Sequence, residues 1–233
     1  MLVIGRVTRT LAAALCAAGL AAGCGSSDDD APDPPDGGTV TVTTMRGALL
    51  QAEDIGPTWK PPTQSADPSR LVAVCGGKAT APPVPPGAEV VSSPLVDEGN
   101  EGAQTLTQTA LVYPDKTAAQ AGLAALRAVA DGCPPSVSVP AEVTDDRSEP
   151  AYTETARATE LNEGGWAGFV VTRHKAYEPA HPGIADTAVA VLARGNVVFV
   201  DTYAVYRIGN ASTSAQFETD WKKLVGTVLN RVG

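Results

Sequence analysis

The second half of the chain contains four β-strand patterns in immediate succession, which limits the possible folds more than any other feature. Each run is rich in β-branched and aromatic residues or alternates apolar and polar side chains. The four runs cover residues 152–161, 166–173, 187–194 and 197–208. Gly195-Asn196 joins the last two as a two-residue hairpin turn, with glycine where a positive φ is favourable. Four successive strands predict an antiparallel sheet.

Three segments with helical periodicity accompany these strands. They cover residues 44–55, 117–132 and 213–231. Thr117 with Gln120, and Thr213 with Gln216, are predicted capping boxes at the start of the second and third helices. The third helix carries one apolar stripe, formed by Phe217, Trp221, Leu224, Val225 and Val228. Such a stripe requires an apolar surface, which the sheet would supply.

The region before the second helix contains one more strand pattern. In residues 104–113, threonines alternate with other side chains. Residues 57–94 are dense in proline and glycine and are expected to be irregular. The order helix, strand, helix, several strands and helix predicts an α+β fold. We expect a curved antiparallel sheet with the helices packed mainly on one face.

The first 23 residues have the layout of a bacterial lipoprotein signal peptide. Arg6 and Arg9 supply positive charge, residues 11–22 form an apolar stretch too short to span a membrane, and Ala-Ala-Gly precedes Cys24. Cys24 is therefore the predicted lipidation site and the predicted contact with the membrane. The several acyl chains of a mature lipoprotein would hold it there. Plain secretion and an uncleaved anchor are the alternatives.

The residues after Cys24 indicate how the chain is divided. Residues 24–43 are rich in aspartate, proline and glycine and predict a flexible tether. The remaining 44–233 have the length of one medium-sized domain. We therefore expect a signal peptide over 1–23, a lipid-anchored tether over 24–43 and a single folded domain over 44–233.

Two of the four cysteines are left for the domain. Cys16 leaves with the signal peptide and Cys24 is assigned to the lipid, which leaves Cys75 and Cys133. A leftover pair in an exported protein most often forms a disulfide. Two free thiols, or a metal site, are the alternatives. The two histidines provide no zinc-site spacing with these cysteines.

Charge and composition exclude one class of partner. The formal net charge is −9, and removal of the leader with its two arginines makes the chain more acidic. An acidic chain is a poor partner for nucleic acid and does not bind anionic headgroups through a basic patch. The abundance of alanine, valine, threonine, proline and glycine favours a GC-rich genome, such as that of an actinobacterium.

Sequence motifs for catalysis, cofactors or metals are absent. The chain has no G-x-S-x-G elbow, no H-E-x-x-H helix, no P-loop and no dinucleotide glycine fingerprint. His174 follows a predicted strand and His181 lies in a proline-rich loop, where histidines are usually solvated or hydrogen-bonded surface groups. We therefore expect no enzyme activity, no cofactor and no metal.

Asp201 interrupts an apolar strand pattern and is the one candidate for a ligand site. If that strand is central, the carboxylate must find a partner or line a cavity. An exposed strand face or a bend is the alternative. Trp166 and Tyr203 are the aromatic residues that could flank such a cavity, although both residue types also serve as core. The sequence thus predicts a ligand cleft at Trp166, Asp201 and Tyr203.

The layout resembles a known family. Residues 110–115 (ALVYPD) lead into 118–121 (AAQA) and a helix that ends at Cys133, followed later by the Gly-Asn hairpin and a terminal amphipathic helix. This pattern is similar to the PknH-like extracellular domain of actinobacterial lipoproteins and receptor kinases, over about residues 45–232. The resemblance implies a disulfide-linked sensor domain with a ligand cleft and no catalytic residues. Many members carry two disulfides and a tryptophan before the helix-end cysteine, which this chain lacks.

These observations favour a lipid-anchored binding or sensor domain on the extracytoplasmic face of the bacterial cell membrane. Its ligand would be a small molecule, a lipid or a cell-wall fragment. A lipid or glycolipid carrier, which needs a deep apolar cavity, is the first alternative. A cell-envelope hydrolase and a purely protein-docking lipoprotein are further alternatives.

Overall fold

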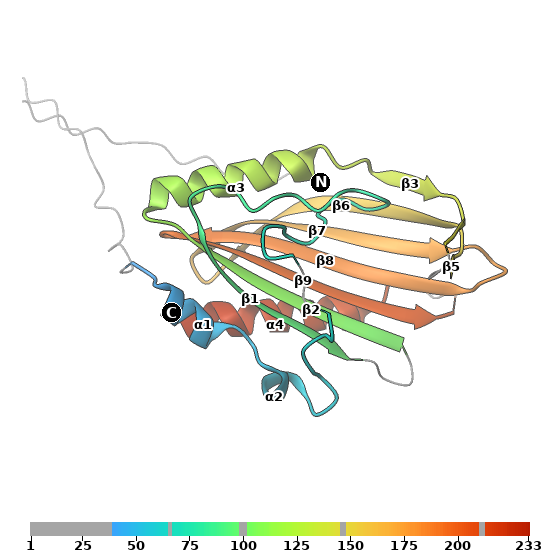
Figure 1. Cartoon of the computed structure of the whole chain (residues 1–233), viewed down its shortest axis with the longest axis horizontal. Coiled ribbons are helices and arrows are strands. Elements are labelled where there is room, and N and C mark those ends of the chain that lie inside the picture. The colour runs from blue at the N-terminus through green and yellow to red at the C-terminus, as the bar shows by residue number, and fades with distance from the viewer. Residues whose placement is uncertain (1–38, 65–66, 98–101, 145–147, 210–212) are drawn as a thin grey trace, which may run out of the picture. The chain divides into compact units, whose positions relative to one another are not determined.

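The domain is built on one antiparallel sheet of seven strands, in the order β1-β2-β9-β8-β7-β6-β3 (Figure 1). The structure is a computed structural model that describes residues 39–64, 67–97, 102–144, 148–209 and 213–233. The strands are β1 (Glu89–Asp97), β2 (Gly102–Val112), β3 (Ser136–Val139), β6 (Tyr152–Glu163), β7 (Trp166–Tyr177), β8 (Gly183–Arg194) and β9 (Val197–Ile208). Two short strands, β4 (Glu142–Val143) and β5 (Ser148–Glu149), pair separately. The predicted α+β fold with an antiparallel sheet is confirmed.

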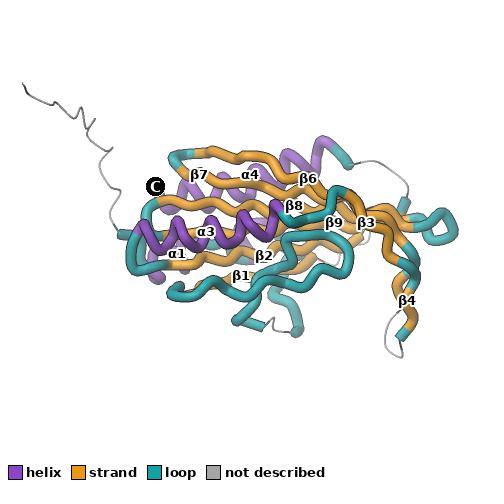
Figure 2. Tube along the Cα trace, turned by 90° about the horizontal axis from the view of Figure 1, so that it is seen from above, coloured by secondary structure: helices purple, strands orange, loops and turns teal. Residues whose placement is uncertain are grey.

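Helices cover both faces of this sheet. Helix α4 (Ala215–Val232) and α1 (Val42–Ala48) lie on one face, and α3 (Lys116–Asp131) lies on the other (Figure 1). Seen from above, α3 lies in front of the strands and α4 behind them (Figure 2). Helix α3 is the exception to the expected gathering of the helices mainly on one face. The reason is that both central strands, β8 and β9, have apolar side chains on both faces.

The packing of β9 shows how the two faces are filled. Val197 and Phe199 point into the core beneath α1 and α4, whereas Val198 and Val200 point into the core beneath α3. Successive residues of a strand point to opposite faces of the sheet. A strand whose successive residues are all apolar must therefore be covered on both faces. Two separate apolar clusters result, one on each side of the sheet.

The helix expected over residues 44–55 is two shorter helices. Helix α1 ends at Ala48, and α2 (Ala52–Ile55) starts after a break. The backbone N–H of Leu50 leaves the helical pattern and donates to the buried Gln108 side chain at 2.9 Å. Gln51 then begins α2, with its backbone N–H bonded to Asp54 at 2.8 Å. A tertiary hydrogen bond thus overrides a continuous helical periodicity.

Strand β1 lies in the segment that the proline content predicts to be irregular. Pro94 lies within β1, which is tolerated because β1 is an edge strand and one of its sides needs no ladder hydrogen bonds. Strands β7 and β8 also extend beyond the predicted runs, β7 to Tyr177 and β8 back to Gly183. Strand β9 has the predicted bounds, and Gly195 in the preceding turn has φ 55°.

The caps of the two long helices differ from the predicted boxes. Asp115 caps α3 by accepting from the Ala118 N–H at 2.8 Å, and Ser214 caps α4 by accepting from the Phe217 N–H at 3.1 Å. The predicted caps Thr117 and Thr213 are therefore wrong: the cap of α3 lies two residues earlier, and the cap of α4 lies one residue later. Aspartate and serine cap helices at least as well as threonine does.

The predicted disulfide between Cys75 and Cys133 is confirmed. It ties the segment before β1 to the C-terminal end of α3. Arg173 donates to the Cys75 carbonyl at 2.7 Å, and the Gly77 N–H donates to the buried carboxylate of Glu154 at 2.6 Å. The disulfide and these hydrogen bonds hold the segment around Cys75 and Gly77, which we call the cysteine loop, against β6 and β7.

Replacing both Cys75 and Cys133 with alanine is expected to lower the free energy of unfolding by about 4 kcal/mol. The bridge closes a loop with a sequence separation of 58 residues, and its loss frees the unfolded chain. Denaturant unfolding followed by circular dichroism measures the change. Wild-type protein in reductant is the control and should match the double variant, whereas equal stability of the variant and the oxidised wild type would contradict the prediction.

Candidate functional site

The three residues of the predicted cleft are buried in the core beneath α1 and α4. Trp166 begins β7, while Asp201 and Tyr203 lie in the middle of β9, and each is at most 3% exposed. The Tyr203 ring stacks on Phe217 with centroids 5.7 Å apart. Trp166 and Tyr203 are both part of the apolar core on this side of the sheet. The cleft remains a prediction, since the hollows described below are lined by other residues.

Asp201 takes part in a buried polar chain. Its Oδ1 accepts from the Gln108 amide at 2.8 Å, Gln108 in turn accepts from the Leu50 N–H, and the Ser93 hydroxyl donates to the Leu50 carbonyl at 2.8 Å. Asp201 therefore lies on a buried strand face, and the exposed face considered above is wrong. Burial raises the pKa of Asp201 to about 7, because the ionised carboxylate loses its hydration. The hydrogen bond from Gln108 lowers this pKa, but by less than burial raises it.

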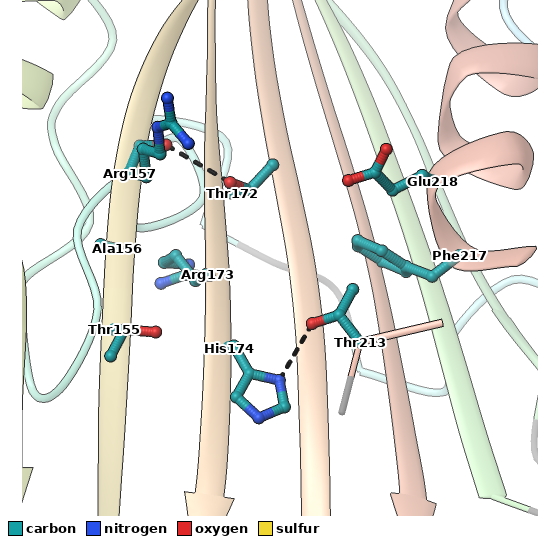
Figure 3. A pocket seen from close by; sticks show the side chains of 9 residues that line it. All are labelled: Thr155, Ala156, Arg157, Thr172, Arg173, His174, Thr213, Phe217 and Glu218. Carbon is teal, nitrogen blue, oxygen red and sulfur yellow. Dashed lines mark hydrogen bonds between the residues drawn. The ribbon is translucent and has the colours of Figure 1, made fainter. Parts of the chain in front are cut away.

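A small hollow opens on the same side of the sheet as α4, where that helix does not cover β6 and β7 (Figure 3). Its volume is about 210 Å³. Thr155 faces His174 directly across the two strands, and Arg157 faces Thr172 in the same way. Thr213, Phe217 and Glu218 close the side formed by the start of α4. Paired strand positions and the start of one helix thus build the walls.

A fully buried carboxylate lies behind this hollow. Asp186 on β8 is 0% exposed. Its Oδ1 accepts from His174 Nδ1 at 2.7 Å and from the Thr213 hydroxyl at 2.6 Å, and its Oδ2 accepts from Arg207 at 2.8 Å. Arg207 also donates to Ser214 at 3.1 Å. A buried charge is tolerated only when it is paired and hydrogen-bonded, and Asp186 has three such donors.

This cluster fixes the orientation of the His174 ring. An imidazole that donates through Nδ1 to a carboxylate presents Nε2 as an acceptor on the other side. No described side chain bonds to Nε2 of His174. Figure 3 shows Arg157 and Glu218 on opposite sides of the hollow, so donors and an acceptor of opposite charge surround it. The site is suited to a small ligand with both donor and acceptor groups.

Two features of the described part of the chain concern groups of metal ligands and a nucleophile beside His174. Within it, no three histidine, cysteine, aspartate or glutamate side chains are grouped as metal ligands. The hydroxyl that contacts His174 belongs to Thr213, and it lies at Nδ1, 3.2 Å away, beside Asp186. A nucleophile for acyl transfer would have to lie at Nε2 instead.

Sequence reasoning identified His174 but assigned it to the surface, and it missed Asp186, Arg207 and Thr213. The cross-strand pair of His174 and Asp186 depends on the register of β7 and β8. The one available signal was an aspartate between apolar residues just before a strand pattern, at Ile184-Ala185-Asp186. That signal identifies a buried carboxylate only once the strand is known to begin at Gly183.

Comparison with known proteins supports the fold. No protein-family model matches the chain, and no curated protein sequence matches it. The solved structure of the extracellular domain of PknH from Mycobacterium tuberculosis is similar, with a TM-score of 0.52 and 14% sequence identity. The match covers 83% of this chain and 97% of that one. At this identity the likeness establishes a shared fold and nothing about ligands.

Replacing Asp201 with asparagine is expected to remove a pH dependence of stability. The unfolded aspartate releases its proton near the ordinary pKa of 3.8, whereas the folded one holds it up to about 7. Folding therefore favours the protonated form, and wild-type stability is full below about pH 4 and falls as the pH rises towards 7. The variant stays neutral and should be more stable than wild type at pH 8 by about 2–4 kcal/mol.

Denaturant unfolding between pH 4 and pH 8 measures this difference. The difference in free energy of unfolding between Asp201→Asn and wild type should be small near pH 4 and increase as the pH rises towards 8. Parallel curves across the whole range would show that Asp201 is not the group responsible.

Proposed function

We propose that this protein is a membrane-anchored lipoprotein with a non-enzymatic extracytoplasmic binding or sensor domain. The leader that ends at Cys24 supports export and lipid attachment. The fold shared with an extracellular domain supports a sensor-type role. Among the described residues, no helix has both the length and the apolar character to cross a membrane.

The proposed ligand site is the hollow at His174. The observation that carries this assignment is the buried Asp186, which uses both carboxylate oxygens to hold His174, Thr213 and Arg207. Burying charged groups is costly, so well-packed apolar residues would stabilise the fold at least as well as this cluster does. A preorganised histidine at the mouth of a hollow is instead useful for recognition. The ligand is proposed to be a small polar cell-envelope compound.

Binding is proposed rather than catalysis because of the geometry around His174. The Asp186 carboxylate and the Thr213 hydroxyl occupy the same side of the imidazole. Among the described residues, no serine, cysteine or threonine is bonded to the opposite nitrogen, Nε2. The proposed role of Nε2 is to accept a hydrogen bond from the ligand.

Lipid attachment is tested by labelling cells with radioactive palmitate. The wild-type chain is expected to incorporate label and to sediment with membranes, and Cys24→Ala to do neither. Cys16→Ala is the matched control, since it removes a leader cysteine that carries no lipid. Equal labelling of wild type and Cys24→Ala would overturn the lipid anchor, and an unlabelled wild type in the medium would favour plain secretion.

Ligand binding at His174 is tested by calorimetry with D-alanyl-D-alanine and muramyl dipeptide as probes. Both combine donor and acceptor groups, as the hollow requires. His174→Gln and Glu218→Gln are each expected to weaken binding about tenfold, the effect of one lost hydrogen bond to a charged or polar group. Glu53→Gln is the matched control, because Glu53 also lies in a first helical turn but on α2. Unchanged affinity in both hollow variants would place the ligand elsewhere.

A further inference from the structure

A second surface of the sheet carries features that the hollow at His174 does not explain. It lies on the face covered by α3, at the ends of β7 and β9 and beside β5. Tyr177 on β7 and Tyr206 on β9 point to this face, since they continue the alternation of the core residues Val171 and Val200. We call the surface around these two rings the tyrosine groove.

The tyrosine groove is an open hollow with a volume of about 620 Å³, lined by Tyr177, Tyr206, Ile208 and Pro182. This volume lies within the range of sites for small organic ligands. A second hollow, of about 600 Å³, also touches Tyr177, but its strand residues Thr153 and Ala176 point to the α4 face, so it is not part of the groove. The groove suits a ligand that lies over the rings of Tyr177 and Tyr206.

The aromatic rings are held in place from below. The rings of Tyr177 and Tyr206 are nearly perpendicular, at 82°, with centroids 6.1 Å apart. Gly183 lies between them on β8, where a Cβ atom would come within 2.9 Å of the Tyr206 hydroxyl oxygen. On the other side, Lys175 sits 3.9 Å above the Tyr152 ring. The groove therefore has a rigid aromatic floor and wall before any ligand arrives.

Exposed apolar side chains are concentrated at this end of the sheet. Four large apolar side chains in the described chain are exposed, and two of them, Tyr206 at 39% and Ile208 at 78%, line the groove. A third, Val143, pairs through β4 with Ser148, which also lines it. Clustered exposed apolar residues mark interaction sites more often than isolated ones do.

The polar groups at the rim restrict the class of ligand. Glu149 and His181 line the groove. Glu149 pairs with Lys175 at 3.2 Å, and His181 pairs with Glu178 at 3.1 Å. Paired charges of this kind offer both hydrogen-bond donors and acceptors, which matches hydroxyl groups because a hydroxyl both donates and accepts. A saccharide ring has an apolar C–H face for stacking on tyrosine and a hydroxyl edge for these polar groups.

We propose that the tyrosine groove is a binding site for an uncharged oligosaccharide chain, with sugar rings stacked on Tyr177 and Tyr206. The site is separate from the hollow at His174 and lies on the opposite face of the sheet. Tyr206 supplies the stacking surface, Ile208 extends it, and the paired polar groups at the rim bind sugar hydroxyls.

The test is titration of the full chain with four neutral tetrasaccharides, namely chitotetraose, cellotetraose, maltotetraose and mannotetraose, followed by calorimetry and NMR. At least one is expected to bind with a Kd below about 1 mM. Tyr206→Ala should weaken that binding at least tenfold, and Tyr206→Phe, which keeps the ring, should restore most of it. Val90→Ala is the matched control, because Val90 is equally exposed at 39% but lies on β1 at the other edge of the sheet.

Other outcomes overturn the proposal. They are a Kd above about 1 mM for every tetrasaccharide, unchanged binding in Tyr206→Ala, or chemical shift changes confined to the hollow at His174. Binding of decaproline or of phosphatidylglycerol vesicles at Tyr206 in place of saccharide would assign the groove to a peptide or to a membrane. If Tyr206→Ala does not fold, Ile208→Ser, at a position 78% exposed, replaces it with the same expected loss. Palmitate labelling at Cys24 and binding at His174 are independent of all these results.

Discussion

Strands β8 and β9 have almost no solvent-facing side, and the rest of the domain is arranged around that constraint. Nine of the twelve residues of β8, and the first seven of β9, are buried. Burial of apolar surface is the main favourable contribution to folding, so both faces of the sheet must be covered. Helices α1 and α4 cover one face, and α3 with the disulfide-linked cysteine loop covers the other. The Cys75–Cys133 disulfide thus joins two parts of the layer that covers this face of the sheet.

Both candidate binding surfaces lie where these covering layers end. Helix α4 starts at Ala215, beside β7, and leaves the outer strands β6 and β7 open around His174. On the opposite face, α3 ends at Asp131, and the far ends of β7 and β9 carry Tyr177 and Tyr206 in the tyrosine groove. A twisted sheet of long strands is larger than the helices packed on it. The uncovered ends therefore present ordered side chains from several strands, which is a rigid basis for recognition.

Two buried aspartates on the α4 side of the sheet illustrate two ways of accommodating a carboxyl group. Asp186 is surrounded by His174, Thr213 and Arg207, which supply donors and positive charge. Asp201 has a single amide donor from Gln108, and burial therefore raises its pKa to about 7. The first arrangement gives both carboxylate oxygens hydrogen-bond donors and orients a histidine at a hollow. The second favours a protonated group, which links the residues after α1 to the centre of the sheet.

Local sequence patterns determined much of this protein: the strand over Val197–Ile208 with its Gly195 turn, the two long helices, and the Cys75–Cys133 pair. These features depend on neighbours within a few residues, or on arithmetic among few cysteines, and can be predicted from a single sequence. Only the tertiary structure decided that β1 pairs at an edge and that α3 crosses to the second face. It also decided that Asp186 meets His174 and Arg207, and that Tyr177 meets Tyr206. Those contacts depend on strand order and register, which arise from packing across the whole sheet and leave no local periodicity.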